Sequence, residues 1–302
     1  MAEVIATIWD FDKTLISEYM QQPLFDKYGV NAEDFWKECN SEIAKHLDSG
    51  LEVNKDTFYL NLILRYVRNG TFKRLDNKKL LNYGKKMNFY PGVIGLFKEI
   101  KSLNDNKLYK AYDIHFENYI VSTGLKKIIE GSDLNPLVEK IWGCEFIEHK
   151  GVIDEVAYSI DNTTKTRAIF EINKGVNIGL NKGTTIDVNT KIPLAQRRVK
   201  FENMIYIADG PSDVPAFSLV NEKKGATLAV YKSQSCAALA QADDLLKNGR
   251  VQFFAEANYN KGSTAYLWLM KKITDRANQI IEEKRATLQK YGAGTPRHLI
   301  ND

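Results

Sequence analysis

Short runs of apolar residues recur along the chain, and each stops at a polar residue or a glycine. Five runs stand out, at 4–9, 119–121, 141–147, 204–208 and 227–231. Runs of this kind, rich in β-branched residues, are typical of strands that are buried on both faces of a parallel sheet. The pattern therefore predicts a sheet that contains these five strands.

Helical patterns alternate with the predicted strands. Apolar residues spaced three and four positions apart predict helices at 93–103, 125–129, 166–172 and 214–220. Alternating strands and helices are typical of α/β proteins. We therefore expect a Rossmann-like parallel sheet core that is flanked by helices.

Two segments depart from this alternation. Residues 17–90 contain helical stretches but no convincing strand, which predicts an all-helical insertion after the first strand. Aromatic residues recur there at helical spacing, and we expect them to form the core of the insertion rather than a platform for substrate. The tail is helix-like from residue 252 and becomes irregular at 292–296. The predicted units are an α/β core at 1–16 and 91–251, a helical insertion at 17–90 and a C-terminal helical extension at 252–302.

Composition limits the class of protein. The 302 residues are 44% hydrophobic and 26% charged, as in ordinary globular chains. No apolar run reaches the roughly 20 residues of a membrane span, and the N-terminus lacks the basic start of a secretory signal. The three cysteines lie far apart, as free thiols do, so we expect a cytoplasmic protein. The formal net charge of +4 is too small to indicate nucleic acid as a partner.

Polar side chains follow three of the predicted strands. Asp10 and Asp12 follow the first strand, Ser122 follows the second, and Asp209 and Asp213 follow the fourth. Ligands of open α/β sheets bind at the carboxyl ends of strands, so these side chains should meet at one edge. Two carboxylates about 4 Å apart repel by about 4 kcal/mol at an effective dielectric near 20, so a cation should lie among them. Oxygen ligands without cysteine or histidine favour a hard ion, and Mg²⁺ commonly binds in this way together with phosphate.

The spacing of Asp10 and Asp12 suits phosphoryl chemistry. Residues at i and i+2 of a strand exit can face one cavity. One carboxylate can attack phosphorus to form an acyl phosphate, and the other can protonate the leaving oxygen and later activate water.

Three segments resemble motifs of the haloacid-dehalogenase-like hydrolase superfamily. Asp10-Phe-Asp-Lys-Thr-Leu15 resembles its first motif, Ile120-Val-Ser-Thr-Gly124 its second and Ile207-Ala-Asp-Gly-Pro-Ser-Asp213 its fourth. The motifs occur in the order of the superfamily and span most of the chain. The insertion at 17–90 is similar to the helical C1-type cap of the phosphoserine-phosphatase-like branch. Lys13 departs from the glycine that many members carry, and lysine makes this loop less permissive.

The resemblance implies a role for each acidic residue. Asp10 would be the nucleophile, and Asp12 would be the general acid and base. The Asp10 carboxylate, the Asp12 backbone carbonyl and Asp209 would bind Mg²⁺. Asp213 would hold metal-bound water or orient a lysine.

The same resemblance implies a phosphate site and a cation. The hydroxyl of Ser122 and the backbone of Thr123 and Gly124 would hold phosphate oxygens. Lys165 stands at the start of a predicted helix, where the superfamily places a lysine that stabilises the transferred group. About 44 residues separate Lys165 from Asp209, and an insertion at 173–200 accounts for this length. Other candidates for this cation are Lys174, Lys182 and Lys191.

Residues and resemblance together predict a Mg²⁺-dependent phosphatase that hydrolyses a small phosphate monoester through an aspartyl-phosphate. Its partner would be a small phosphorylated metabolite, with neither nucleic acid nor a membrane involved. Three alternatives stay open: a phosphoryl transferase or mutase, a phosphonate hydrolase, and a non-catalytic phosphometabolite-binding protein. Dehalogenation is disfavoured because it needs no acid at the position of Asp12. The sequence specifies neither the substrate nor whether the C-terminal extension mediates self-association into a homo-oligomer.

Overall fold

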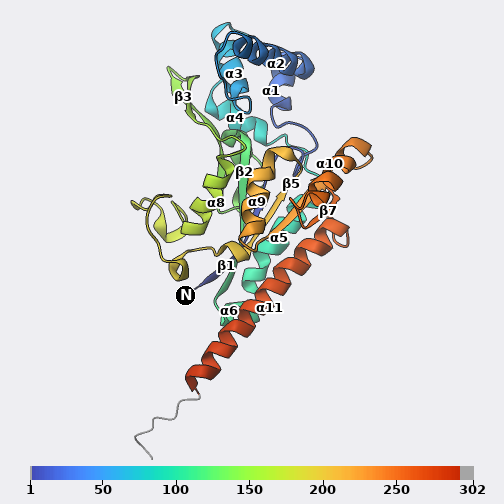
Figure 1. Ribbon diagram of the computed structural model, residues 1–302. Coiled ribbons are helices and arrows are strands. Elements are labelled where there is room, and N and C mark those ends of the chain that lie inside the picture. The colour runs from blue at the N-terminus through green and yellow to red at the C-terminus, as the bar shows by residue number, and fades with distance from the viewer. Residues whose placement is uncertain (1, 293–302) are drawn as a thin grey trace, which may run out of the picture.

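A seven-stranded sheet forms the centre of the protein (Figure 1). The computed structural model describes residues 2–292, so the segment predicted to be irregular lies almost entirely outside the described residues. The strand order is β4-β3-β2-β1-β5-β6-β7, and neighbouring strands are parallel except for β3 and β4. The strands are β1 (Glu3–Trp9), β2 (Ile114–Leu125), β3 (Lys140–His149), β4 (Val152–Tyr158), β5 (Met204–Ala208), β6 (Ala226–Tyr231) and β7 (Phe253–Glu256). The predicted α/β fold with a parallel sheet is confirmed.

Strand β1 lies in the middle of the sheet because its residues are apolar on both faces. Six of its seven residues are buried. Trp9, the last residue of β1, pairs in register with Ile120 of β2 and with Ile207 of β5. The residues that follow these three strands therefore lie side by side at one edge of the sheet.

Helices cover both faces of the sheet. On one face lie α5 (Val93–Ser102) and α11 (Thr264–Gly292), which are joined by a hydrogen bond from the Tyr266 hydroxyl to Glu99 at 2.7 Å (Figure 1). On the other face lie α8 (Lys165–Lys174) and α9 (Val214–Glu222), and Glu171 of α8 accepts a hydrogen bond from the Trp142 indole at 2.7 Å. The remaining core helices are α6 (Lys107–Ala111), α7 (Lys126–Glu130) and α10 (Cys236–Lys247).

Four helices form a cap beyond the carboxyl ends of the strands (Figure 1). Its core contains Phe25, Phe35 and Phe72, which are fully buried, and the rings of Phe25 and Phe35 are 4.7 Å apart. The chain enters and leaves the cap side by side, because the Tyr90 amide donates to the Leu15 carbonyl at 2.8 Å. The helices are α1 (Gln22–Tyr28), α2 (Ala32–Asp48), α3 (Phe58–Arg68) and α4 (Asn77–Gly84).

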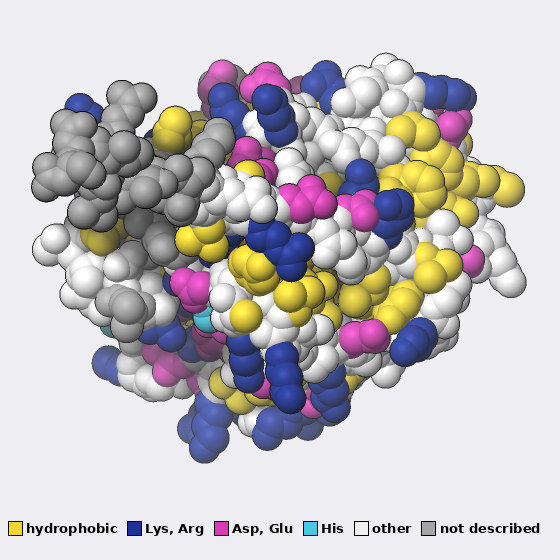
Figure 2. All heavy atoms as spheres, turned by 90° about the horizontal axis from the view of Figure 1, so that it is seen from below, with side chains coloured by type: hydrophobic (Ala, Val, Ile, Leu, Met, Phe, Trp, Pro, Cys, Tyr) yellow, Lys and Arg dark blue, Asp and Glu magenta, His cyan; other side chains and the backbone are white. Residues whose placement is uncertain are grey.

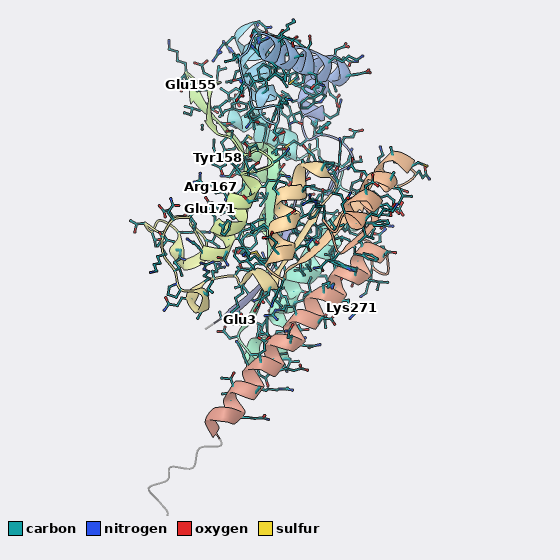
Figure 3. All side chains as sticks on the ribbon, viewed as in Figure 1. Glu3, Glu155, Tyr158, Arg167, Glu171 and Lys271 are labelled. Atoms are coloured by element: carbon teal, nitrogen blue, oxygen red, sulfur yellow. The ribbon has the colours of Figure 1, made fainter. Side chains whose placement is uncertain are left out.

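The antiparallel hairpin of β3 and β4 connects the core to the cap. Figure 3 shows Glu155 of β4 beside the cap and Tyr158 nearer the core. Nearer the hairpin turn, two hydrogen bonds join β4 to the cap. The Ile153 amide donates to the Leu75 carbonyl at 3.0 Å, and Arg68 donates to the Asp154 carbonyl at 2.7 Å. The hairpin thus fixes α3 and the segment before α4.

A second contact between cap and core is made by two glycines, which we call the glycine seam. A Cβ atom on Gly84 of α4 would lie 2.0 Å from the Ile128 carbonyl oxygen of α7. A Cβ atom on Gly131, which ends α7, would lie 1.7 Å from the Leu81 carbonyl oxygen of α4. Only glycine allows the two helices to approach this closely.

Three strands of the structure, β2, β4 and β7, differ from the sequence-based expectation. Strand β2 begins at Ile114, five residues before its predicted start, and β4 was not predicted. Residues 252–302 were expected to be helical, but 253–256 form β7, which pairs with β6 before α11 begins. Residues 176–200 form only short 3₁₀ turns and irregular backbone.

The face opposite the cap has no single sign of charge. Figure 2 shows Lys and Arg side chains scattered among Asp and Glu, with apolar patches between them. Among the helices of residues 2–292, none combines the length and the apolar character that crossing a bilayer requires.

Candidate active site

Three carboxylates gather at the carboxyl ends of β1 and β5. Asp10 directly follows β1, Asp209 directly follows β5, and Asp213 ends the 3₁₀ turn that leads into α9. One oxygen atom from each lies within 4.8 Å of the others. The predicted meeting of these acids at one edge of the sheet is therefore seen in the structure.

Lys165 lies between two of these carboxylates. Its ammonium is 2.9 Å from Asp10 Oδ1 and 2.6 Å from Asp213 Oδ1, and its side chain is 1% exposed. It is the first residue of α8, as the sequence predicted. The competing candidates lie elsewhere: Lys174 donates to the carbonyls of Val188 and Thr190, and Lys182 and Lys191 are exposed.

Two residues to which the sequence assigned no role complete this arrangement. The Thr14 hydroxyl donates to Asp10 Oδ2 at 3.0 Å, so both oxygens of Asp10 are held. The Tyr206 hydroxyl donates to Asp213 Oδ1 at 2.5 Å from within β5. Thr14 lies within the segment that resembles the first motif, so the sequence could have indicated a role for it. Tyr206 lies inside an apolar strand and had no signal to separate it from a core residue.

Asp12 lies beside this cluster and contacts the segment that leads into the cap. Its Oδ1 accepts the backbone N–H of Met20 at 2.9 Å, and Met20 begins the approach to α1. Asp12 is partly buried, and its side chain is not one of the three clustered carboxylates. Its carboxyl group is therefore available to a group that lies between cap and core.

Ser122, Thr123 and Gly124 form an irregular stretch of β2 rather than a helix start. The register between β2 and β3 shifts between Val121 and Leu125, so these residues leave the regular ladder. Ser122 Oγ accepts the Gly124 amide at 3.0 Å, which leaves its hydroxyl hydrogen free to donate. Met20 packs against Gly124, where a Cβ atom would lie 2.2 Å from the Met20 Cε.

Burial dominates the electrostatics of the acidic cluster. It raises the pKa of Asp10, although the Lys165 ammonium opposes this, and Asp213 adds to the rise. Burial and then the charge of Asp10 raise the pKa of Asp209 to about 7. Burial and the charge of Asp10 raise the pKa of Asp12 well above its usual range. Burial alone would lower the pKa of Lys165, but the charges of Asp10 and Asp213 raise it by more than this. The pKa therefore lies above its usual value, and the lysine stays charged.

The donor set fits a hard divalent cation. Asp10, Asp209 and Asp213 offer only oxygen atoms, and one lysine does not balance their charge. Asp213 accepts hydrogen bonds from Lys165, Tyr206 and Ser212, and Asp10 accepts them from Lys165 and Thr14. Asp209 is the most open of the three, because no described side chain donates to its carboxylate.

Tyr259, which lies between β7 and α11, supports the loop after Asp10. The Tyr259 hydroxyl donates to the Thr14 carbonyl at 2.7 Å, and its amide donates to the Pro91 carbonyl at 2.7 Å. A Cβ atom on Gly92 would lie 2.2 Å from the carbonyl carbon of Tyr259, so this approach requires glycine. Tyr259 therefore holds together the loop after Asp10 and the return from the cap. The sequence carried no signal for it.

Comparison with known proteins gives one sequence relative and several structural neighbours. No family model matches the chain. An uncharacterized protein of Borreliella burgdorferi is 40% identical over 289 residues, which cover 89% of this chain and 96% of that protein. The crystal structure of a HAD family hydrolase from Salmonella enterica serovar Typhi matches with a TM-score of 0.52 and 15% identity, over 88% of this chain and 70% of that one. A phosphoserine phosphatase, solved as a phospho-aspartyl intermediate analogue, matches with a TM-score of 0.49 and 16% identity, over 83% and 93% of the two chains.

Proposed function

We propose that this chain, which belongs to the same family as the Borreliella burgdorferi protein and has the fold of the haloacid-dehalogenase-like hydrolases, is a Mg²⁺-dependent phosphatase. Its substrate is a small phosphate monoester, and hydrolysis proceeds through an aspartyl-phosphate on Asp10. The observation that carries the proposal is the fixed carboxylate of Asp10, whose two oxygens are held by Lys165 at 2.9 Å and by Thr14 at 3.0 Å.

The first chemical step uses Asp10 and Asp12. An Asp10 oxygen attacks phosphorus, the bond from phosphorus to the ester oxygen breaks, and the leaving oxygen takes a proton from Asp12. The raised pKa of Asp12 supports this role, because a higher pKa favours the protonated carboxyl group that a general acid needs. Asp12 Oδ1 accepts the Met20 amide, so the proton belongs on Oδ2.

The second step returns the protein to its starting state. The Asp12 carboxylate takes a proton from a water molecule, whose oxygen attacks phosphorus and displaces Asp10 as a carboxylate. Inorganic phosphate leaves, and Asp12 is again protonated. The buried position of Lys165 between Asp10 and Asp213 keeps a positive charge next to the transferred group in both steps.

Mg²⁺ bound by Asp10 and Asp209 would supply positive charge next to the phosphoryl oxygens. Ser122 supports the same region, because its free hydroxyl hydrogen can bind a phosphate oxygen at the irregular end of β2. Met20 covers this stretch from the cap side, which excludes water from it.

The test is release of inorganic phosphate from a panel of phosphorylated metabolites with Mg²⁺ present. We expect Asp10→Asn to lower kcat about 10³-fold or more, because asparagine cannot form the acyl phosphate. Asp133→Asn is the matched control, because Asp133 is exposed, and it should keep full activity. Full activity in Asp10→Asn, or no phosphate release by the unmodified protein from any of the metabolites, would contradict the proposal.

A further inference from the structure

Lys13 adopts a backbone conformation that favours glycine. Its φ angle is 59°, in the left-handed region, and it directly follows Asp12. A residue with a Cβ atom loses roughly 1–2 kcal/mol in this region relative to ordinary helical or extended backbone. Backbone strain of this kind persists mainly at functional sites. A glycine here would remove the strain. Six other described non-glycine residues share this conformation, so the case for Lys13 rests on the contacts of its side chain.

The ammonium of Lys13 has donors to spare. It donates to the Tyr19 hydroxyl at 2.9 Å and lies 4.4 Å from the centre of the Tyr19 ring. Among the side chains that the structure describes, no carboxylate oxygen lies within 4.0 Å of it. Lys165 is the contrast, since it is buried and bonded to two carboxylates. Two of the three N–H donors of Lys13 are therefore free for a ligand.

The surroundings of Lys13 are both acidic and accessible. Lys13 directly follows Asp12, and the residue is exposed. Its ammonium is therefore a positive charge beside the site that is not paired with a carboxylate. Tyr19, its hydrogen-bond partner, is 42% exposed.

A row of aromatic side chains links Lys13 to the phosphate end of the site. The Tyr19 ring lies 5.1 Å from that of Trp36 in α2, and the Trp36 ring lies 5.8 Å from that of Tyr59 in α3. The Tyr59 hydroxyl donates to the Thr123 carbonyl at 2.8 Å. This row lies on the cap side of the site, and Lys13 stands at its outer end.

We propose that Lys13 is a specificity-determining residue that binds an anionic group on the leaving part of the substrate. Preferred substrates are then phosphate monoesters whose alcohol carries a second anion, a carboxylate or a phosphate. The inference rests on the proposed phosphatase function. Lys13 belongs to the leaving-group side because it adjoins Asp12, which protonates the leaving oxygen, whereas Lys165 contacts the nucleophile itself.

The experiment compares substrates that differ in one charge. The first pair is glycerol 3-phosphate and 3-phosphoglycerate, which differ only in that the second has a carboxylate where the first has a hydroxymethyl group. The second pair is a hexose monophosphate and a hexose bisphosphate, which tests a second phosphate as the anion. We expect the unmodified protein to prefer an anionic member. Lys13→Gly should reduce that preference in kcat/KM by about tenfold or more, mainly through KM. Lys13→Arg should restore it, because arginine keeps the charge.

Two readouts keep the result interpretable. Lys13→Gly should unfold at a higher temperature than the unmodified protein, because glycine relieves the strain, so a loss of preference is not a loss of folding. Binding of both glycerol compounds to Asp10→Asn, measured by calorimetry with and without Lys13→Gly, reads the ionic contact without turnover. The two claims can fail separately. If binding shows a charge preference that depends on Lys13 but the unmodified protein releases no phosphate, the proposed function is overturned and the role of Lys13 stands. Equal losses for charged and neutral substrates, or no preference at the outset, would overturn the role of Lys13.

Discussion

One lysine serves two carboxylates at the centre of the site. Lys165 bonds Asp10 and Asp213, and its side chain is 1% exposed, so the three charges depend on one another for solvation. Asp209 stands near them without a cation of its own among the described residues. Buried charges are tolerated when they are paired, so the excess negative charge in this cluster favours either protonation or a bound metal ion.

This competition predicts that Mg²⁺ binding depends on pH. The pKa of Asp209 is raised to about 7, above its value in an unfolded chain. The metal-free folded protein is therefore more stable at low pH, where Asp209 is protonated, and it loses this stability as the pH rises through about 7. A metal ion binds the ionised form. The ionised fraction of Asp209 changes about tenfold between pH 6 and pH 8, so Mg²⁺ affinity should rise about tenfold.

The measurement is thermal unfolding after EDTA treatment, with Mg²⁺ added back at both pH values. The rise in Tm per added Mg²⁺ should be larger at pH 8. In Asp209→Asn the Mg²⁺ response should be weak at both pH values. An equal response of the unmodified protein at pH 6 and pH 8 would show that the proton and the metal ion do not compete.

Single residues differ in how far the sequence reveals them. Asp10, Asp209 and Asp213 could be placed together because each follows a recognisable strand, and Lys165 because it begins a helix. Tyr206 could not, because a tyrosine within an apolar strand has the same pattern whether its hydroxyl is bonded or not. The roles of all these residues stay predictions until the variants are measured.

At the scale of elements, the cap is held by more than its two connecting segments. The β3–β4 hairpin bonds α3 and the segment before α4, and the glycine seam joins α4 to α7. The sequence revealed the cap helices through their apolar spacing, but not β4, because its apolar and acidic residues do not alternate strictly. β7 was missed because four residues are too few for a pattern.

The glycine seam predicts a large difference between two Gly→Ala variants. Gly131→Ala would place a methyl group 1.7 Å from the Leu81 carbonyl oxygen, so α4 and α7 must separate. We expect the free energy of unfolding to fall by about 1–3 kcal/mol, as in other overpacked sites. Denaturant titration measures this change.

Gly95→Ala is the matched control. Gly95 lies within α5, and a Cβ atom there would meet nothing within 4 Å outside its own helix. Alanine should therefore raise the free energy of unfolding by about 0.5–1 kcal/mol through better helix propensity. Two variants that shift stability in the same direction would mean that α4 and α7 are not in tight contact.

The whole molecule depends on its C-terminal segment more than the predicted division suggests. Strand β7 completes the sheet, and α11 buries Leu269, Ile273 and Ala277 against it. Helical spacing alone does not show what a helix packs against, so the sequence predicts only an extension at 252–302.

Truncation tests this dependence. A chain that ends at residue 251 exposes one edge and one face of the core, so it should lose cooperative thermal unfolding and most of its soluble yield. A chain that ends at Glu282 keeps every buried residue of α11 in the described part of the helix and should retain a cooperative transition. Circular dichroism compares the two. A cooperative transition in the shorter chain would show that the core folds without β7 and α11.

The hydrogen bond from Tyr259 to Thr14 spans 245 residues of sequence. Ribosomes add roughly 5–20 residues per second, so about 12–50 s pass between synthesis of the loop after Asp10 and synthesis of the tyrosine that supports it. The partners of Asp10 from α8 and β5 are synthesised within that interval, before Tyr259. The arrangement that the proposed hydrolysis requires would therefore be complete only after Tyr259 has been added to the chain.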